Sequence, residues 1–481
     1  MWIVALVACT EGSGDTGGPV ASVPLDDVNL LVHDPARSNP FSGLDDLQLR
    51  LINESGEVVL DETWDVDEGP ELDAVELYGT FRMTLAGLDN GDVVAFGRTA
   101  WFSLVPGHTT DLTMLFTSAN QAVPLDATMA KERSEHIAER LPGGKVLVCG
   151  GRSPEGTSAY DDCEIYDPTD FDFDNAQVSL PRALYGSRTQ WSGDGDLLFV
   201  TGGTEIDGPL GEAPSVYGAV YDPVDEVLDE LPPMSAPRAN HCFAIFRDAY
   251  GIAIGNGEEK LDYLLAQQDS GSYEWTYITM SLFDAVNVHS CVTTVDRKVF
   301  LLGSTETSTG VFDYADNASA TLITEAFTPL TQALGGDVSY RRGAMLVPMS
   351  DGNVWIGGGI DTTLDTAVKD ARVFNPDSLV FGAGPDPDVA RVDGDTDLWI
   401  EDDWAVLSCG TIDGTDPQTR VELMNVADGD LVAVELDRPR PGCRATVLDD
   451  GAILVTGGYD PADLQATAAA VIVPYRSADD S

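Results

Sequence analysis

The sequence predicts an all-β protein built from seven copies of one strand-forming motif. The motif is clearest in residues 448–458 (LDDGAILVTGG), where a polar turn leads into an alternating apolar strand that stops at a glycine pair. Glycine has no Cβ and turns the chain easily at positive φ, so the pair ends the strand. The marker glycines of the seven copies are Gly150, Gly202, Gly255, Gly303, Gly358, Gly410 and Gly457. Successive marker numbers differ by 52, 53, 48, 55, 52 and 47, and a repeat of this length is one supersecondary unit that buries its core against its neighbours.

Each copy continues through a variable loop into a third strand. Several of these strands end at a proline, as in CEIYDP (163–168), GAVYDP (218–223) and ARVFNP (371–376). The whole unit resembles a kelch repeat of the galactose-oxidase-type propellers. The resemblance implies a seven-bladed kelch-like β-propeller over residues 119–476, with one four-stranded sheet per repeat and the first strand of each sheet lining a central channel.

The last repeat lacks an outer strand, because only a polar tail (477–481) follows its third strand at 468–475. Residues 121–128 precede the first repeat and are expected to supply the missing strand. Such a closure would protect the open edges of the first and last units.

The region before the repeats divides into three parts. Residues 25–118 contain short alternating runs separated by turn formers, which predicts a small β-sandwich. Its part 81–116 resembles the closing strands of immunoglobulin- or prealbumin-like domains, which act as spacers, so we assign no site there. Residues 10–24 are rich in Gly, Ser, Asp and Thr and are expected to form a flexible tether.

Residues 1–9 (MWIVALVAC) are apolar up to a cysteine and resemble a bacterial lipoprotein signal peptide with its lipobox. The resemblance implies lipidation of Cys9 and an exported, extracytoplasmic lipoprotein at the outer membrane or cell surface. The structural alternative is a frayed apolar end with a free thiol. No other stretch is long and apolar enough to span a bilayer, so we expect membrane attachment only through the lipid.

The charge balance excludes several partner classes. The chain has 81 Asp and Glu against 26 Lys and Arg, a formal net charge of −55. Nucleic acids and anionic lipid surfaces need an excess of cations, so neither is an expected partner. The negative charge favours solubility and repulsion between copies, hence a monomer; binding of divalent cations or cationic partners is the alternative.

Six cysteines remain besides Cys9, an even number that predicts disulfides in an exported protein, with fifteen possible connectivities. The blade geometry that the kelch resemblance implies favours the pairs Cys149–Cys163, Cys242–Cys291 and Cys409–Cys443. No CxxC motif indicates a zinc or redox site.

An arginine recurs where the first strands begin. These residues are Arg133, Arg182, Arg238, Arg341 and Arg440, with Arg391 near the equivalent place in the sixth repeat. If they surround the channel mouth, they can bind carboxylates or acidic sugars through bidentate hydrogen bonds. The structural alternative is ion pairing between blades with the abundant acidic residues.

Two further groups of residues are candidate metal ligands. His136, His241 and His289 each precede their marker glycine by 14 residues, so they are candidate metal ligands or structural histidines of the kelch pattern. Asp393, Asp395 and Asp397 are spaced as in calcium loops, although acidic loops are also expected from the composition alone. We therefore expect no cofactor, with calcium as the alternative.

No motif for a nucleophile, a metalloprotease or a nucleotide site is present. The sequence thus favours a binding or scaffold protein that presents the loops after each glycine pair to a protein or glycan. The alternatives are a carbohydrate-active enzyme, oxidase- or epimerase-like, that uses the arginine-lined face, and a purely structural envelope component. A deep arginine-lined pocket with a converging acid and base would favour the enzyme, and a broad apolar patch would favour protein binding.

Overall fold

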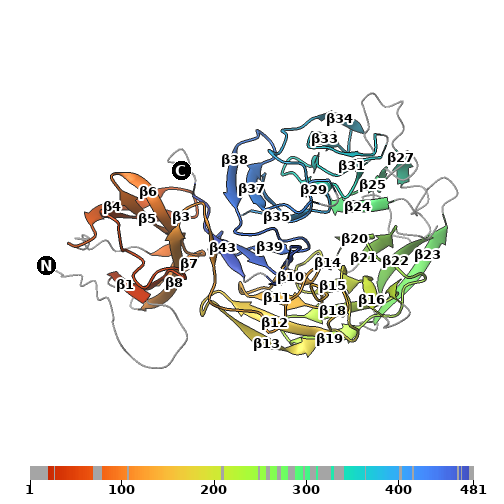
Figure 1. Cartoon of the computed structure of the whole chain (residues 1–481), viewed down its shortest axis with the longest axis horizontal. Helices are drawn as coiled ribbons and strands as arrows, with labels where there is room; N and C mark the ends of the chain where they lie inside the picture. Colours follow the sequence, from red (N-terminus) through yellow and green to blue (C-terminus); the bar gives the residue numbers. More distant parts are fainter. Residues whose placement is uncertain are drawn as a thin grey trace.

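The chain is described by a computed structural model, in which every regular element is a β-strand (Figure 1). The structure describes residues 20–25, 28–68, 78–105, 108–206, 211–247, 250–255, 260–267, 272–279, 288–295, 298–303, 310–312, 327–329, 341–362, 364–399, 403–413, 416–462, 465–466 and 469–475. Within these ranges the predicted all-β class is confirmed. In the same ranges we find no helix of the length and hydrophobicity that membrane crossing requires. Cys9 lies outside the described residues.

The N-terminal region forms one eight-stranded sheet. Its strands are β1 (Val20–Leu25), β2 (Val28–His33), β3 (Asp46–Asn53), β4 (Val58–Asp65), β5 (Gly79–Asp89), β6 (Asp92–Arg98), β7 (Phe102–Leu104) and β8 (Thr110–Ser118). Their order is β1-β2-β8-β6-β5-β3-β4, and β7 pairs with β5. The first strand thus begins within the segment that the sequence suggested as tether.

This sheet differs from the sandwich of two packed sheets that the sequence suggested. It curls as a half-barrel around one core, which contains Leu30 of β2, Leu49 of β3, Met83 of β5 and Phe116 of β8. The strands β2 and β8 pair in parallel, and this pairing joins the β1–β2 hairpin to the other strands in one continuous sheet. Alternating apolar residues satisfy a curved sheet as well as a sandwich, so the sequence pattern cannot distinguish them.

The described part of the repeat region contains seven four-stranded sheets, numbered here in chain order. Sheet 1 has β10 (Ile137–Arg140), β11 (Val146–Cys149), β12 (Asp162–Asp167) and β13 (Asp172–Ser179); sheet 2 has β14 (Arg188–Trp191), β15 (Leu198–Thr201), β18 (Gly218–Asp222) and β19 (Val227–Glu230). Sheet 3 has β20 (Cys242–Arg247), β21 (Tyr250–Ile254), β22 (Lys260–Gln267) and β23 (Ser272–Thr279); sheet 4 has β24 (Val288–Thr293), β25 (Val299–Gly303), β26 (Gly310–Phe312) and β27 (Phe327–Pro329). Sheet 5 has β29 (Met345–Pro348), β30 (Val354–Gly357), β33 (Arg372–Asn375) and β34 (Val380–Ala383); sheet 6 has β35 (Asp395–Leu398), β36 (Trp404–Ser408), β37 (Arg420–Asn425) and β38 (Leu431–Glu435). Sheet 7 has β39 (Arg444–Val447), β40 (Ile453–Thr456), β43 (Ala470–Ile472) and β9 (Ala122–Pro124).

Short hairpins follow some of the glycine pairs. They are β16 (Thr204–Ile206) with β17 (Glu212–Pro214), β31 (Ile360–Asp361) with β32 (Thr366–Ala367) and β28 (Arg341–Arg342), and β41 (Tyr459–Asp460) with β42 (Gln465–Ala466). Within each sheet the strands are antiparallel. The turn between the first two strands therefore lies at one end of the sheet, the turn end, and the glycine pair at the other, the glycine end.

The first strands of consecutive sheets lie next to one another. Contacts join β14 to β20, β20 to β24, β24 to β29, β29 to β35, β35 to β39 and β39 to β10. Between sheets 1 and 2 the Thr189 hydroxyl on β14 donates to Oε1 of Glu139 on β10. Figure 1 shows the sheets following one another from yellow to blue, with β39 beside β10.

Sheet 7 takes its outer strand from the segment before the first repeat, as the sequence predicted. The strand β9 pairs antiparallel with β43, with Val123 opposite Val471. Just outside the pair, the Asn120 side-chain amide donates to the Tyr475 carbonyl at 2.7 Å and its oxygen accepts the Tyr475 amide at 2.8 Å. Residues from opposite ends of the repeat region thus complete one sheet.

The glycine pairs lie where one sheet meets the next. At Gly457, φ is +62° and an added Cβ would lie 2.4 Å from the Arg133 carbonyl oxygen. The adjacent Gly458 amide donates to that same oxygen at 2.9 Å. A side chain at Gly457 would therefore both strain the backbone and displace the contact between sheets 7 and 1.

The three disulfides join the pairs that the sequence favoured. Cys149–Cys163 links two strands of sheet 1, Cys242–Cys291 links sheets 3 and 4, and Cys409–Cys443 links sheets 6 and 7. Three disulfides are typical of proteins that fold in an oxidising, extracytoplasmic compartment.

The N-terminal sheet contacts the turn ends of the repeat region. Nε of Arg98 on β6 donates to the Asp450 carbonyl in the β39–β40 turn at 2.7 Å, and its guanidinium lies 4.8 Å from the Trp399 ring centre in the β35–β36 turn. His33 stacks on Phe171 in the β12–β13 turn, with ring centres 4.2 Å apart. All three contacts lie at the opposite end of the sheets from the glycine pairs.

Candidate functional site: a central cavity at the glycine end

Four of the five predicted arginines are buried inside the repeats. Arg133, Arg238, Arg341 and Arg440 are at most 1% exposed. Arg182 is different, because half of its side chain is exposed and its Nη1 lies 3.9 Å from Glu205.

Arg238 and Arg133 bind acceptors of their own repeat. Nη1 of Arg238 donates to the carbonyl of its marker Gly255 at 2.9 Å, while Nη2 donates to Oδ2 of the fully buried Asp262 at 2.8 Å. Arg133 likewise donates to the Gly150 carbonyl at 2.7 Å and pairs with Glu164 on β12. These guanidinium groups tie the first strand to the glycine turn and to the third strand. These two arginines therefore form ion pairs, as the structural alternative expected. The pairs lie within one sheet, whereas the sequence suggested pairs between neighbouring blades.

Two of the predicted histidines form matching contacts between neighbouring sheets. Nε2 of His136 lies 2.9 Å from Oγ1 of Thr456, and Nε2 of His241 lies 3.0 Å from Oγ1 of Thr201. Each threonine directly precedes a glycine pair of the preceding sheet. We call these two pairs the histidine latches. Burial lowers the pKa of both imidazoles well below the usual value, and nearby arginines lower it further.

His289 is half-buried and lines the cavity described below, rather than forming such a latch. Within the described ranges, no group of three His, Cys, Asp or Glu side chains is arranged to hold a metal ion.

The buried neutral state of His241 predicts a pH effect on stability. The unfolded imidazole has a pKa of about 6.5 and the folded one a much lower pKa, so below pH 6.5 the unfolded chain binds more protons and the wild type loses stability. We expect the advantage of wild type over His241→Gln to shrink as the pH falls from 6.5 to 5, by at most about 1.4 kcal/mol per pH unit. Urea denaturation at pH 7.5, 6 and 5 measures it.

Thr201→Val is the matched control, because it removes the same hydrogen bond and keeps the imidazole. The stability that this variant loses relative to the wild type should stay constant over this pH range. A constant deficit for His241→Gln would contradict the assignment.

The three predicted calcium-site aspartates lie at the start of sheet 6 and reach different partners. Asp395 accepts the Ala445 amide at 2.9 Å and Asp397 accepts the Val447 amide at 2.8 Å, both on β39 of the next sheet. Asp393 is exposed at the cavity. Two of the carboxylates thus hold sheet 7 through its backbone, and calcium binding remains a prediction.

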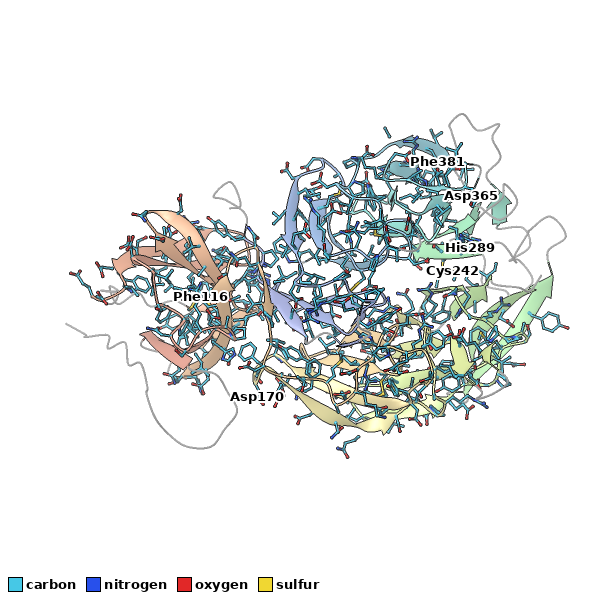
Figure 2. All side chains as sticks on the ribbon, viewed as in Figure 1. Phe116, Asp170, Cys242, His289, Asp365 and Phe381 are labelled. Carbon is cyan, nitrogen blue, oxygen red and sulfur yellow. A yellow bond between two sulfur atoms is a disulfide. The ribbon has the colours of Figure 1, made fainter. Side chains whose placement is uncertain are left out.

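A cavity of about 960 Å³ lies between the first strands of all seven sheets. Its lining includes Arg152 and Tyr459, which directly follow glycine pairs, and Thr411, which follows the marker Gly410, so the cavity reaches the glycine end. Figure 2 labels His289 and Cys242, which lie on the neighbouring first strands β24 and β20 and line this cavity.

The cavity is lined by balanced charges, unlike the chain as a whole. Its arginines are Arg140, Arg152, Arg188, Arg342 and Arg444. Its acids are Glu135, Glu139, Asp393, Asp395 and Asp397. None of these arginines belongs to the set predicted from the sequence. Two of them could have been found from the Thr-Gly-Gly sequences at 201–203 and 456–458. Arg188 lies opposite Thr201 in the ladder of sheet 2, and Arg444 lies opposite Thr456 in that of sheet 7.

Two of the acids have strongly raised pKa values. Burial raises the pKa of Glu139 to about 7. The hydrogen bond from the Thr189 hydroxyl lowers this pKa, and the charges of Asp397 and Asp395 raise it. Burial likewise raises the pKa of Asp397 to about 6, with the Asp395 charge adding to it. Such groups can exchange protons near neutral pH.

Comparison with known protein families and with curated proteins finds no match for this chain.

Proposed function

We propose that the chain is a lipid-anchored, extracytoplasmic binding protein whose seven sheets form a kelch-like β-propeller. The near-regular repeat, the one four-stranded sheet per repeat and the contacts between consecutive first strands support the propeller. The pairing of β9 with β43 supports ring closure. The lipobox-like sequence before Cys9 and the three disulfides support export to the cell envelope as a monomeric lipoprotein.

The observation that carries the binding function is the opposition of two ends. The N-terminal sheet, which follows the proposed tether and anchor, contacts the turn ends through Arg98 and His33. The cavity reaches the glycine end, where the short hairpins lie. Because the N-terminal sheet contacts the turn ends, the hairpins and the cavity lining at the glycine end remain free to receive a partner.

The composition of the lining favours a glycan over an apolar protein surface. Gln190, Ser290 and Thr396 offer amide and hydroxyl groups, and Trp191 offers an aromatic ring. Sugars present hydroxyl groups for hydrogen bonding, and specific sites use a few convergent polar groups beside aromatic side chains.

The test uses the full chain with Cys9→Ser, so that it can be purified without lipid, on a glycan array. Replacing residues 205–213 with a Gly-Gly turn removes the β16–β17 hairpin at the glycine end of sheet 2. We expect this change to weaken binding of array hits about tenfold or more, the effect of losing one to two kcal/mol of contacts.

The matched control shortens the β18–β19 turn of the same sheet, at the turn end, and should leave affinity unchanged. Equal binding by the hairpin variant and the parent chain would contradict recognition at the glycine end.

The enzyme alternative is favoured by one specific observation. Glu139 and Asp397 occupy the same ladder level in sheets 1 and 6, on either side of sheet 7, and both line the arginine-containing cavity. Their raised pKa values suit a proton donor and acceptor. Chromatography of array ligands after incubation decides it: new products that disappear with Glu139→Gln would favour catalysis, and unchanged ligands favour binding.

A further inference from the structure

Arg188 of sheet 2 and Arg444 of sheet 7 occupy equivalent places. Each lies opposite the threonine of a histidine latch, Thr201 or Thr456. Each Nε donates to the carbonyl of the latch histidine, at 3.0 Å from Arg188 to His241 and at 2.9 Å from Arg444 to His136. Both arginines line the cavity.

The two arginines differ in what the preceding sheet offers them. Nη1 of Arg444 lies 3.1 Å from Oδ1 of Asp395 in sheet 6. Asp395 lies opposite Ser408, and the corresponding pair in sheet 1, which precedes Arg188, is Ile137 opposite Cys149.

The correspondence is fixed by the buried arginines. Arg391 donates to the carbonyl of Cys409, which follows Ser408, just as Arg133 donates to that of Gly150, which follows Cys149. An aliphatic side chain thus stands where a carboxylate would pair with Arg188.

The guanidinium of Arg188 is therefore left incompletely paired. Among the described residues its only hydrogen bond runs from Nε to His241, and neither Nη group has a partner. Burial lowers the pKa of Arg188 and the charge of Arg444 lowers it further, while the charges of Asp393, Asp395 and Glu135 raise it. Although the chain has 81 acidic and 26 basic side chains, no described carboxylate lies within hydrogen-bond or ion-pair distance of Arg188.

We propose that the cavity contains a carboxylate-binding subsite at Arg188, where a ligand carboxylate takes the place that Asp395 takes beside Arg444. The two free Nη groups suit a charge-assisted pair with a carboxylate. Arg342 lines the same cavity and adds a further positive charge to it. The inference rests on the proposed glycan-binding function and names the ligand as an acidic sugar, a hexuronate.

The experiment titrates the full chain with Cys9→Ser by calorimetry, using hexuronate oligosaccharides, their methyl esters and the matching neutral oligosaccharides. The esters keep the size of the sugar and remove only the charge. We expect at least one acid to bind about tenfold or more tighter than its ester, and Arg188→Met to abolish this preference. Arg182→Met removes an exposed arginine outside the cavity lining and should keep it.

The comparison of acid with ester in the parent chain does not depend on how well a variant folds. Equal affinity for acids and esters, no binding of any acid, or an unchanged preference in Arg188→Met would each overturn the subsite. If neutral sugars bind and the acids bind no tighter than they do, the glycan-binding function stands without the subsite. If no glycan binds here or on the array, the proposed function itself is contradicted.

Discussion

Replacing Arg238 with Met is expected to destabilise the chain by about 3–5 kcal/mol, because it leaves a buried carboxylate without its counterion. Asp262 is fully buried, and its Oδ2 accepts from both Nε and Nη2 of Arg238, at 3.1 and 2.8 Å. The change also removes the donor to the Gly255 carbonyl. The midpoint of urea denaturation at pH 7 measures the loss.

Arg182→Met is the matched control, because this arginine is half exposed and we expect an effect below about 0.5 kcal/mol. The double variant Arg238→Met with Asp262→Leu removes both charges and should recover part of the stability. Equal midpoints for Arg238→Met and Arg182→Met would show that the buried pair does not stabilise its repeat.

Replacing Val123 with Asp is expected to cost several kcal/mol, because it places an unpaired carboxylate in the core where the chain closes on itself. Val123 lies in β9 and is 6% exposed, in a cluster with Val146 of sheet 1, Val471 of sheet 7 and Leu115 of the N-terminal sheet. The free energy of unfolding and the protease sensitivity of the chain measure the effect.

Gln121→Asp introduces the same charge at an exposed position directly before β9 and should change stability by less than about 0.5 kcal/mol. A similarly small effect at Val123 would contradict the closure of sheet 7 by β9.

The repeat region was predictable because its signals are local and recur. A glycine, followed by a second one in four of the seven repeats, ends each second strand for steric reasons that hold wherever the next sheet approaches, as at Gly457. The last repeat lacks an outer strand of its own, and few segments of the sequence could supply one. The segment that was predicted to do so forms β9. The N-terminal half-barrel was not predictable, because the parallel pairing of β2 with β8 joins residues about 80 positions apart.

The candidate site was predictable only in part. The sequence shows that an arginine begins most first strands, but the acid that faces it comes from the third strand, as with Asp262 beside Arg238. Four of those arginines are therefore buried, and their side chains bind acceptors within the chain. The cavity arginine Arg188 is distinguished by what it lacks, an acid at the place of Ile137, and this appears only when the ladders of neighbouring sheets are aligned.

The most direct test of the account is hydrogen–deuterium exchange of the full chain with Cys9→Ser, with and without a glycan selected on the array. The account predicts slower exchange at the glycine end, in peptides covering residues 185–191, 203–217 and 442–446. Exchange should stay unchanged in the turns at 168–171 and 449–451, where the N-terminal sheet contacts the repeats. Protection confined to those turns or to the N-terminal sheet would contradict ligand recognition at the cavity mouth.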